Sequence, residues 1–284
     1  MDILETMMEQ ALEATLSNET QSIESINAIV EEIIQSENTE RLPENPKSLL
    51  VSETTSRFNG AAWYDIILRS RIVLAGIGGI GSWTALLLSR LNPAGLYLYD
   101  SDVVEMGNMS GQLHSNQYCG DLKINSISNI INNIGCYYGT IGYNRFYNER
   151  DRTEDIMICG FDNMESRKLF FNKWYRRVLD SYDSSKCLFI DGRLNAESFQ
   201  IFAIRGDDMR AIEEYNNKWL FSDDEADETI CSYKQTSFMA AMIASTMVNL
   251  YVNHMANLCD PIIPRDVPFF TEYTAETMFT KTIM

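Results

Sequence analysis

The sequence contains few of the residues that hold structural metals. Its 284 residues include two histidines, at 114 and 254, and six cysteines, no two of which are spaced as CxxC. We therefore expect no zinc site, because structural zinc is usually held by such cysteine pairs with further Cys or His ligands. The cysteine spacing is irregular and the chain is large, so a secreted disulfide framework is not expected either.

Long apolar runs are also lacking. No run approaches the roughly 18 residues that a membrane-spanning helix needs. The first residues, Met1-Asp-Ile-Leu-Glu, do not have the charged-then-apolar layout of a signal peptide. We expect a cytoplasmic protein that makes no membrane contact.

Positive charge is scarce. The chain has 23 Lys and Arg against 40 Asp and Glu, which gives a net charge of −17. Binding to nucleic acid depends on a basic surface that contacts phosphates, so the composition excludes nucleic acid as an expected partner. Residues 1–40 contain ten acidic residues and no basic one, and so carry −10 of this charge.

The acidic N-terminal segment also has apolar residues at helical spacing, which predicts amphipathic helices. Pro43 and Pro46 end this pattern. We take 1–47 as an acidic helical extension and linker, and 48–284 as the main domain with a C-terminal strand or tail from about residue 260. The extension either packs on the main domain or a dimer partner, or serves as a detachable docking arm.

From residue 71 onward, short apolar stretches alternate with helical ones. Strands are predicted over 71–75, 95–100, 155–159, 187–191 and 199–204, and helices over 83–91, 123–134, 165–183 and 237–257. This alternation predicts an α/β fold: a Rossmann-like, doubly wound, mainly parallel sheet with helices on both faces. The last helix is apolar nearly all round and is expected to be buried.

A glycine-rich turn, Gly76-Ile-Gly78-Gly79-Ile-Gly81-Ser82, joins the first predicted strand to its helix. Such glycines let the backbone approach a phosphate at the N-terminus of the helix. Asp100 follows 24 residues after Gly76, at the end of the second strand, where a carboxylate can accept hydrogen bonds from ribose hydroxyls. The pattern predicts a nucleotide site, and an NAD-dependent oxidoreductase is one interpretation of it.

Further motifs favour a different nucleotide. In order, they are Asp100-Ser-Asp102, Asn108-Met-Ser-Gly111-Gln112, Gly120-Asp-Leu-Lys123 and Asp162-Asn163-Met-Glu-Ser-Arg167. With the glycine turn, these motifs resemble the ThiF/MoeB/HesA family of E1-like enzymes over about residues 71–257, in a divergent member of bacterial or phage type. The resemblance implies ATP-dependent adenylation of the C-terminal carboxylate of a ubiquitin-like protein or peptide, with or without a later thioester. It also implies a homodimer.

The resemblance assigns roles to individual residues and implies ATP and Mg²⁺ as cofactors. The nucleotide-binding set is Gly76, Gly78, Gly79, Gly81, Asp100, Asn108, Gln112 and Lys123. Asp100 would hold the ribose, Asn108 and Gln112 would line the phosphate side, and Lys123 would neutralise phosphate charge. Asp162 would bind Mg²⁺, a hard cation that prefers oxygen ligands.

Each of these roles has a plainer alternative. Lys123 is otherwise a solvated residue at a helix start, and Asn108 only shapes a turn. Asp162 and Asn163 together suit the N-cap of the next helix. Arg167 either pairs on a helix surface or touches the ligand.

Two positions depart from the family pattern. Gly111 stands where the family carries a phosphate-binding arginine, and in Arg57-Phe-Asn-Gly60 a second glycine falls where another arginine belongs. Either the site is degenerate and the protein serves binding or assembly, or another guanidinium has taken over. Arg193 is the candidate, because it follows the strand that ends at Asp191; its alternative role is an ion pair with Asp191 or Glu197.

Cys231 lies just before the last predicted helix, where the family has its crossover loop. In some members the cysteine there accepts the acyl group as a thioester. Lys234 and the nearby helix N-terminus would lower the pKa of the thiol, whereas the surrounding acidic residues favour the neutral form. Cys231 is therefore either a catalytic or a structural cysteine.

Overall fold

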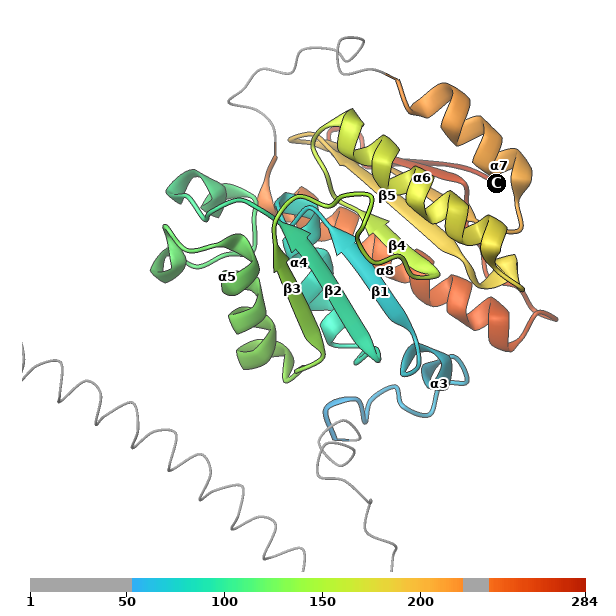
Figure 1. Ribbon diagram of the computed structural model, residues 1–284, viewed down its shortest axis with the longest axis horizontal. Coiled ribbons are helices and arrows are strands. Elements are labelled where there is room, and N and C mark those ends of the chain that lie inside the picture. Colours follow the sequence, from blue (N-terminus) through green and yellow to red (C-terminus); the bar gives the residue numbers. More distant parts are fainter. Residues whose placement is uncertain (1–52, 222–234) are drawn as a thin grey trace, which may run out of the picture. The chain divides into compact units, whose positions relative to one another are not determined.

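The computed structural model describes residues 53–221 and 235–284 (Figure 1). The amphipathic helices expected within 1–47 and the candidate nucleophile Cys231 lie outside these residues. Within the described ranges, no helix is both long and apolar enough to span a membrane.

An eight-stranded sheet forms the centre of the domain, with strand order β3-β2-β1-β4-β5-β6-β7-β8. The strands are β1 (Arg71–Ala75), β2 (Gly95–Asp100), β3 (Thr140–Asn144), β4 (Ile156–Cys159), β5 (Leu188–Leu194), β6 (Ser198–Arg205), β7 (Phe270–Thr274) and β8 (Phe279–Ile283). The pairs from β3 to β5 are parallel, and β6, β7 and β8 extend the sheet in antiparallel fashion. The predicted mainly parallel sheet is confirmed.

The described helices connect and cover these strands. They are α3 (Tyr64–Ile67), α4 (Gly79–Ser89), α5 (Lys123–Ile130), α6 (Met164–Asp180), α7 (Met209–Glu214) and α8 (Ser237–Cys259). Short 3₁₀ helices are η1 (Met106–Ser110), η2 (Asn116–Tyr118) and η4 (Ser184–Lys186), and π-helical turns are η3 (Ile131–Gly135) and η5 (Tyr215–Trp219).

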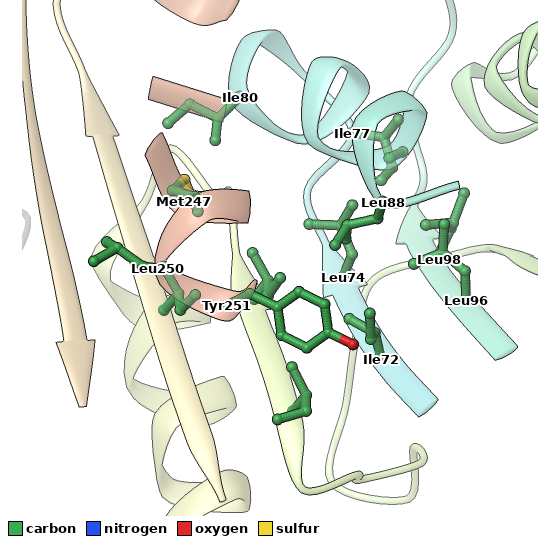
Figure 2. Packing of buried hydrophobic residues seen from close by; sticks show 14 of the residues in the cluster. Ile72, Leu74, Ile77, Ile80, Leu88, Leu96, Leu98, Met247, Leu250 and Tyr251 are labelled. Carbon is green, nitrogen blue, oxygen red and sulfur yellow. The ribbon is translucent and has the colours of Figure 1, made fainter. Parts of the chain in front are cut away.

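Two hydrophobic cores lie on opposite faces of the sheet. On one face, Ile72 and Leu74 of β1 pack with residues of α4, α5 and α8, among them Leu88 and Tyr251 (Figure 2). The intervening residues of β1 point to the other face, which α6 and α7 cover, because side chains alternate along a strand. That second core is rich in aromatic residues: Phe170, Phe171, Trp174, Phe189 and Tyr215. Helices therefore cover both faces, as predicted.

Some element boundaries differ from the predicted ones. Helix α4 begins at Gly79, inside the glycine motif and earlier than the predicted start at residue 83. Strand β3 was not predicted, because its sequence Thr-Ile-Gly-Tyr-Asn contains glycine and asparagine, which are rare in strands. Helix α8 was expected to be buried, but it is buried along only one side, and Phe238 on the other side is 54% exposed.

Candidate functional site

The glycine loop follows β1 at the carboxyl end of the parallel strands. Gly76 has φ +84°, and a Cβ at this position would lie 2.6 Å from the carbonyl carbon and oxygen of Gly160. The Gly76 N–H donates to the Tyr99 carbonyl at 2.9 Å, and the Gly160 N–H donates to the Ala75 carbonyl at 2.8 Å. Only glycine fits here, because the backbone is left-handed and is closely approached by the segment after β4.

Two further glycines lie where α4 meets this loop. A Cβ at Gly81 would lie 1.8 Å from the Gly76 carbonyl oxygen, so the first turn of the helix packs directly on the loop backbone. Gly78 occupies the N-cap position of α4, and it has no side chain that could accept a hydrogen bond from the first turn of the helix. The N–H groups of the first turn are thus not capped by that residue, and a helix N-terminus favours an anion.

Asp100 lies at the end of β2 and is fixed against the glycine loop. Its Oδ2 accepts the Ile77 N–H at 2.7 Å, and its Oδ1 accepts the Asp102 N–H at 2.8 Å. Burial raises the pKa of Asp100, and the two backbone donors and Lys123 oppose that rise. The carboxylate is therefore held where the sequence predicts the ribose-binding acid.

Lys123 is the first residue of α5 and is buried, with 7% of its surface exposed. Its Nζ lies 2.8 Å from Asp102 Oδ2, and its backbone N–H donates to the Asp102 carbonyl at 2.9 Å. The alternative of a solvated residue at a helix start is wrong. The structure brings Lys123, Asp100 and the glycine loop together at one edge of the sheet.

His114 belongs to the same cluster, although no sequence motif indicated a role for it. Its Nδ1 lies 2.9 Å from Ser126 Oγ, and its Nε2 lies 3.4 Å from the Ile77 carbonyl of the glycine loop. Burial lowers the pKa of His114 to about 4, so the imidazole is neutral at pH 7. A lone histidine two residues after Gln112 carries no recognisable motif, and only its contact with the loop reveals its position.

Asn108 and Gln112 differ in their hydrogen bonding. Asn108 Oδ1 accepts the Glu105 N–H at 2.9 Å and forms part of the capping box of η1, so Asn108 does shape a turn. Gln112 lies beside the loop, with Nε2 3.9 Å from the Cβ position of Gly78, and its buried Oε1 has no hydrogen-bond partner within the described residues. An unpaired buried acceptor is costly, so a donor on a bound ligand would stabilise this side chain.

Asp162 follows β4 at the same end of the sheet and is exposed. The N-cap of α6 is its neighbour Asn163, whose Oδ1 accepts the Ser166 N–H at 2.8 Å; Asp162 itself is not the cap. The described part of the chain contains no cluster of three or more His, Cys, Asp or Glu side chains that could hold a metal. A Mg²⁺ bound through one carboxylate, phosphates and waters needs no such cluster, and Asp162 suits that role.

Arg193 is engaged in a buried ionic network around Asp191. Arg193 Nε lies 2.9 Å from Asp191 Oδ2, and Arg193 Nη2 donates to the Trp219 carbonyl at 2.7 Å. Asp191 also accepts hydrogen bonds from Tyr215 at 2.8 Å and from Arg167. The ion pair with Asp191 is therefore present. Arg167 is buried, so of its two alternatives the pairing on a helix surface is wrong.

A glycine loop, a carboxylate ending the second strand and a buried lysine thus meet at the carboxyl ends of β1 and β2. This arrangement is typical of the doubly wound α/β class of fold. The sequence model of the ThiF family matches residues 52–282, and the chain belongs to that family.

Curated relatives share part of the chain. Ubiquitin-like modifier-activating enzyme 5 of Drosophila mojavensis is 31% identical over 115 residues, covering 40% of this chain and 28% of that protein. The Drosophila ananassae enzyme is 27% identical over 192 residues, covering 62% of this chain and 48% of that protein. The matched region therefore spans about half or less of these relatives.

Solved structures share the fold. PaaA superposes with a TM-score of 0.63 at 13% identity, covering 92% of this chain and 81% of PaaA. Escherichia coli tRNA N6-threonylcarbamoyladenosine dehydratase, TcdA, in complex with ATP gives 0.58 at 15% identity, covering 78% and 100% of the two chains. E. coli MccB with ATP gives 0.58 at 13% identity, covering 84% and 71%.

Proposed function

We propose that this protein is an ATP-dependent, E1-like adenylyltransferase that activates the C-terminal carboxylate of a ubiquitin-like protein or peptide. Membership of the ThiF family supports adenylation in general. The relatives named as ubiquitin-like modifier-activating enzymes, and MccB solved with MccA-N7isoASN, support a protein or peptide substrate.

The observation that carries this proposal is the burial of Lys123 beside the glycine loop. A lysine is rarely buried unless it is paired, because removing an ammonium ion from water is costly. Its partner Asp102 has a side chain that is 61% exposed, so the pair is open to a ligand on the side of Asp102. A nucleotide phosphate bound at the carboxyl ends of β1 and β2 would be stabilised by the positive charge of the Lys123 ammonium group. Hydride transfer to NAD needs no such lysine.

The proposed reaction makes one bond and breaks one. A carboxylate oxygen of the substrate attacks the α-phosphorus of ATP, the bond to the β-phosphate oxygen breaks, and pyrophosphate leaves. Because a weak nucleophile meets a highly charged group, positioning and charge neutralisation supply most of the catalysis. Asp100 would orient the ribose, Lys123 would neutralise phosphate charge, and Asp162 would hold the Mg²⁺ that binds phosphate oxygens.

A substitution at Lys123 tests the proposal. Lys123→Met should weaken ATP binding, measured by isothermal titration calorimetry with Mg²⁺, by about tenfold or more, since one charge-assisted hydrogen bond contributes roughly 1.5–3 kcal/mol. Lys218→Met is the matched control, because Lys218 pairs with Glu214 and its side chain is 68% exposed. Equal ATP affinity in both variants, with wild-type melting temperatures, would contradict the role of Lys123.

A second candidate function is a binding or assembly protein that has lost adenylation, and Gly111 in place of the family arginine favours it. ATP–pyrophosphate exchange with candidate C-terminal peptides separates the two. Exchange that disappears in Asp162→Ala supports an enzyme. ATP binding without exchange for any peptide that the protein binds supports the assembly role.

Several finer features complete the proposal. We propose a cytoplasmic homodimer in which residues 48–284 form the adenylation domain and the acidic residues 1–47 form an extension. We also propose that the Cys231 thiolate attacks the carbonyl carbon of the acyl-adenylate, which breaks the bond to the phosphate oxygen, releases AMP and leaves the acyl group on Cys231 as a thioester. A thioester is tested by a hydroxylamine-sensitive, Cys231-dependent adduct with the activated peptide.

A further inference from the structure

Gln235 contacts two glycines of the candidate site, although it lies more than a hundred residues away from either. It directly precedes Thr236, the N-cap residue of α8. A Cβ at Gly79 would lie 2.1 Å from Gln235 Oε1, and a Cβ at Gly111 would lie 2.6 Å from Gln235 Cγ and 2.8 Å from its Cδ. The side chain of Gln235 therefore occupies the space that a Cβ would fill at Gly79 and at Gly111, and it packs directly against the backbone of both glycines.

The surrounding contacts fix this arrangement. Thr236 Oγ1 donates to the Ala196 carbonyl at 2.8 Å, which holds the chain next to Gln235 against the end of β5. Trp83 Nε1 donates to the Gly111 carbonyl at 3.1 Å, which ties Gly111 to α4. Gly111 has φ −137°, a value that residues with a side chain also adopt, so the nearby Gln235 side chain rather than the backbone excludes a Cβ there.

The position of the Gln235 amide matters because Gly79 is the first residue of α4. A phosphate bound at the N-terminus of α4 would need the space next to the Gly79 backbone, which the Gln235 amide occupies. The amide oxygen carries partial negative charge, so it is favourable at the positive end of the helix, as a phosphate oxygen would be. Two such groups cannot occupy the same space.

We propose that Gln235 fills the phosphate position in the nucleotide-free protein and withdraws when ATP binds, so that Gln235 sets the affinity for ATP. This inference rests on the proposed function. It also accounts for Gly111: the glycine makes room for Gln235, and the two residues form a matched pair where the family pattern has an arginine. Gly111 is then a partner of Gln235 rather than a sign of a degenerate site.

Binding of ATP with Mg²⁺, measured by isothermal titration calorimetry, tests the competition. Gln235→Ala should lower the Kd by about fivefold, which corresponds to about 1 kcal/mol, because the side chain no longer has to be displaced. Gln117→Ala is the matched control, since Gln117 is an exposed glutamine of η2 that touches neither glycine, and its Kd should equal that of the wild type.

Thermal stability tests the packing without any nucleotide. Gly111→Ala should lower the melting temperature of the wild type, because its Cβ would overlap Gln235. The same substitution in the Gln235→Ala background should lower it by much less. A double-mutant cycle isolates this coupling.

The outcomes are distinct. Tighter ATP binding in Gln235→Ala together with coupling to Gly111 supports the inference. Unchanged or weaker ATP binding in Gln235→Ala overturns it while leaving the proposed function intact. Failure of both the wild type and Gln235→Ala to bind ATP overturns the proposed function and the inference together, and additive melting shifts overturn the matched pair.

Discussion

Gly76→Ala tests the close backbone approach that holds the glycine loop in place. A non-glycine residue at φ +84° costs about 1–2 kcal/mol, and forcing a methyl group against the Gly160 backbone adds about 1–3 kcal/mol. The free energy of unfolding should therefore fall by about 2–5 kcal/mol, a large part of the stability of an ordinary domain. Urea unfolding with linear extrapolation measures the change.

Two other glycines separate the causes. Gly120 has φ +91° but open space where a Cβ would lie, so Gly120→Ala should cost only the backbone strain, about 1–2 kcal/mol. Gly107 has neither a left-handed φ nor a neighbour within 4 Å, and Gly107→Ala should change stability by less than about 0.5 kcal/mol. If Gly76→Ala lowers the free energy of unfolding no more than Gly120→Ala does, then the contact between the glycine loop and the segment after β4 is not what restricts residue 76 to glycine.

Three further predictions concern pH, the buried ionic network and the metal. Burial lowers the pKa of His254 to about 4, so from pH 7.5 to 5.5 the unfolded chain takes up a proton that the folded protein does not. Over this range, urea unfolding should show that the wild type loses about 1 kcal/mol more stability than His254→Leu, since His114 contributes the same loss to both proteins. Equal losses in the two proteins would refute the burial effect. Arg167→Met should lower the free energy of unfolding by about 1.5–3 kcal/mol, because Asp191 loses one charged donor but keeps Arg193 and Tyr215, while the same change at the exposed Arg210 should alter it little. Calorimetry with and without Mg²⁺ should show that Asp162→Asn removes most of the Mg²⁺ dependence of ATP binding; an unchanged dependence would exclude Asp162 as the ligand.

The regular part of the fold was predictable because its signals are local. The apolar run of β1, the glycines after it and Asp100 at the end of β2 each reflect the conformation of their own segment. The sequence also predicted α8 as a helix, but not which side of it is buried, because apolar residues occur nearly all round it. The exact start of α4 was not predictable, because glycine is equally compatible with a turn and with the first turn of a helix.

Features that depend on contacts between distant segments were not predictable. Nothing in the sequence near Arg167 indicates that its guanidinium is buried against Asp191. His114 reveals its place only through its approach to the Ile77 carbonyl. Gly111 is a similar case. The sequence shows only that a glycine stands where the family has an arginine, whereas the structure shows that the side chain of Gln235 packs against this glycine.

The identity of the bound nucleotide tests the central claim most directly. Native mass spectrometry of the purified full-length protein, incubated with equal concentrations of ATP and NAD in the presence of Mg²⁺, measures which one the site retains. The account predicts a complex with ATP or AMP that is depleted in Lys123→Met and preserved in Lys218→Met. A complex with NAD that is insensitive to Lys123 would contradict it.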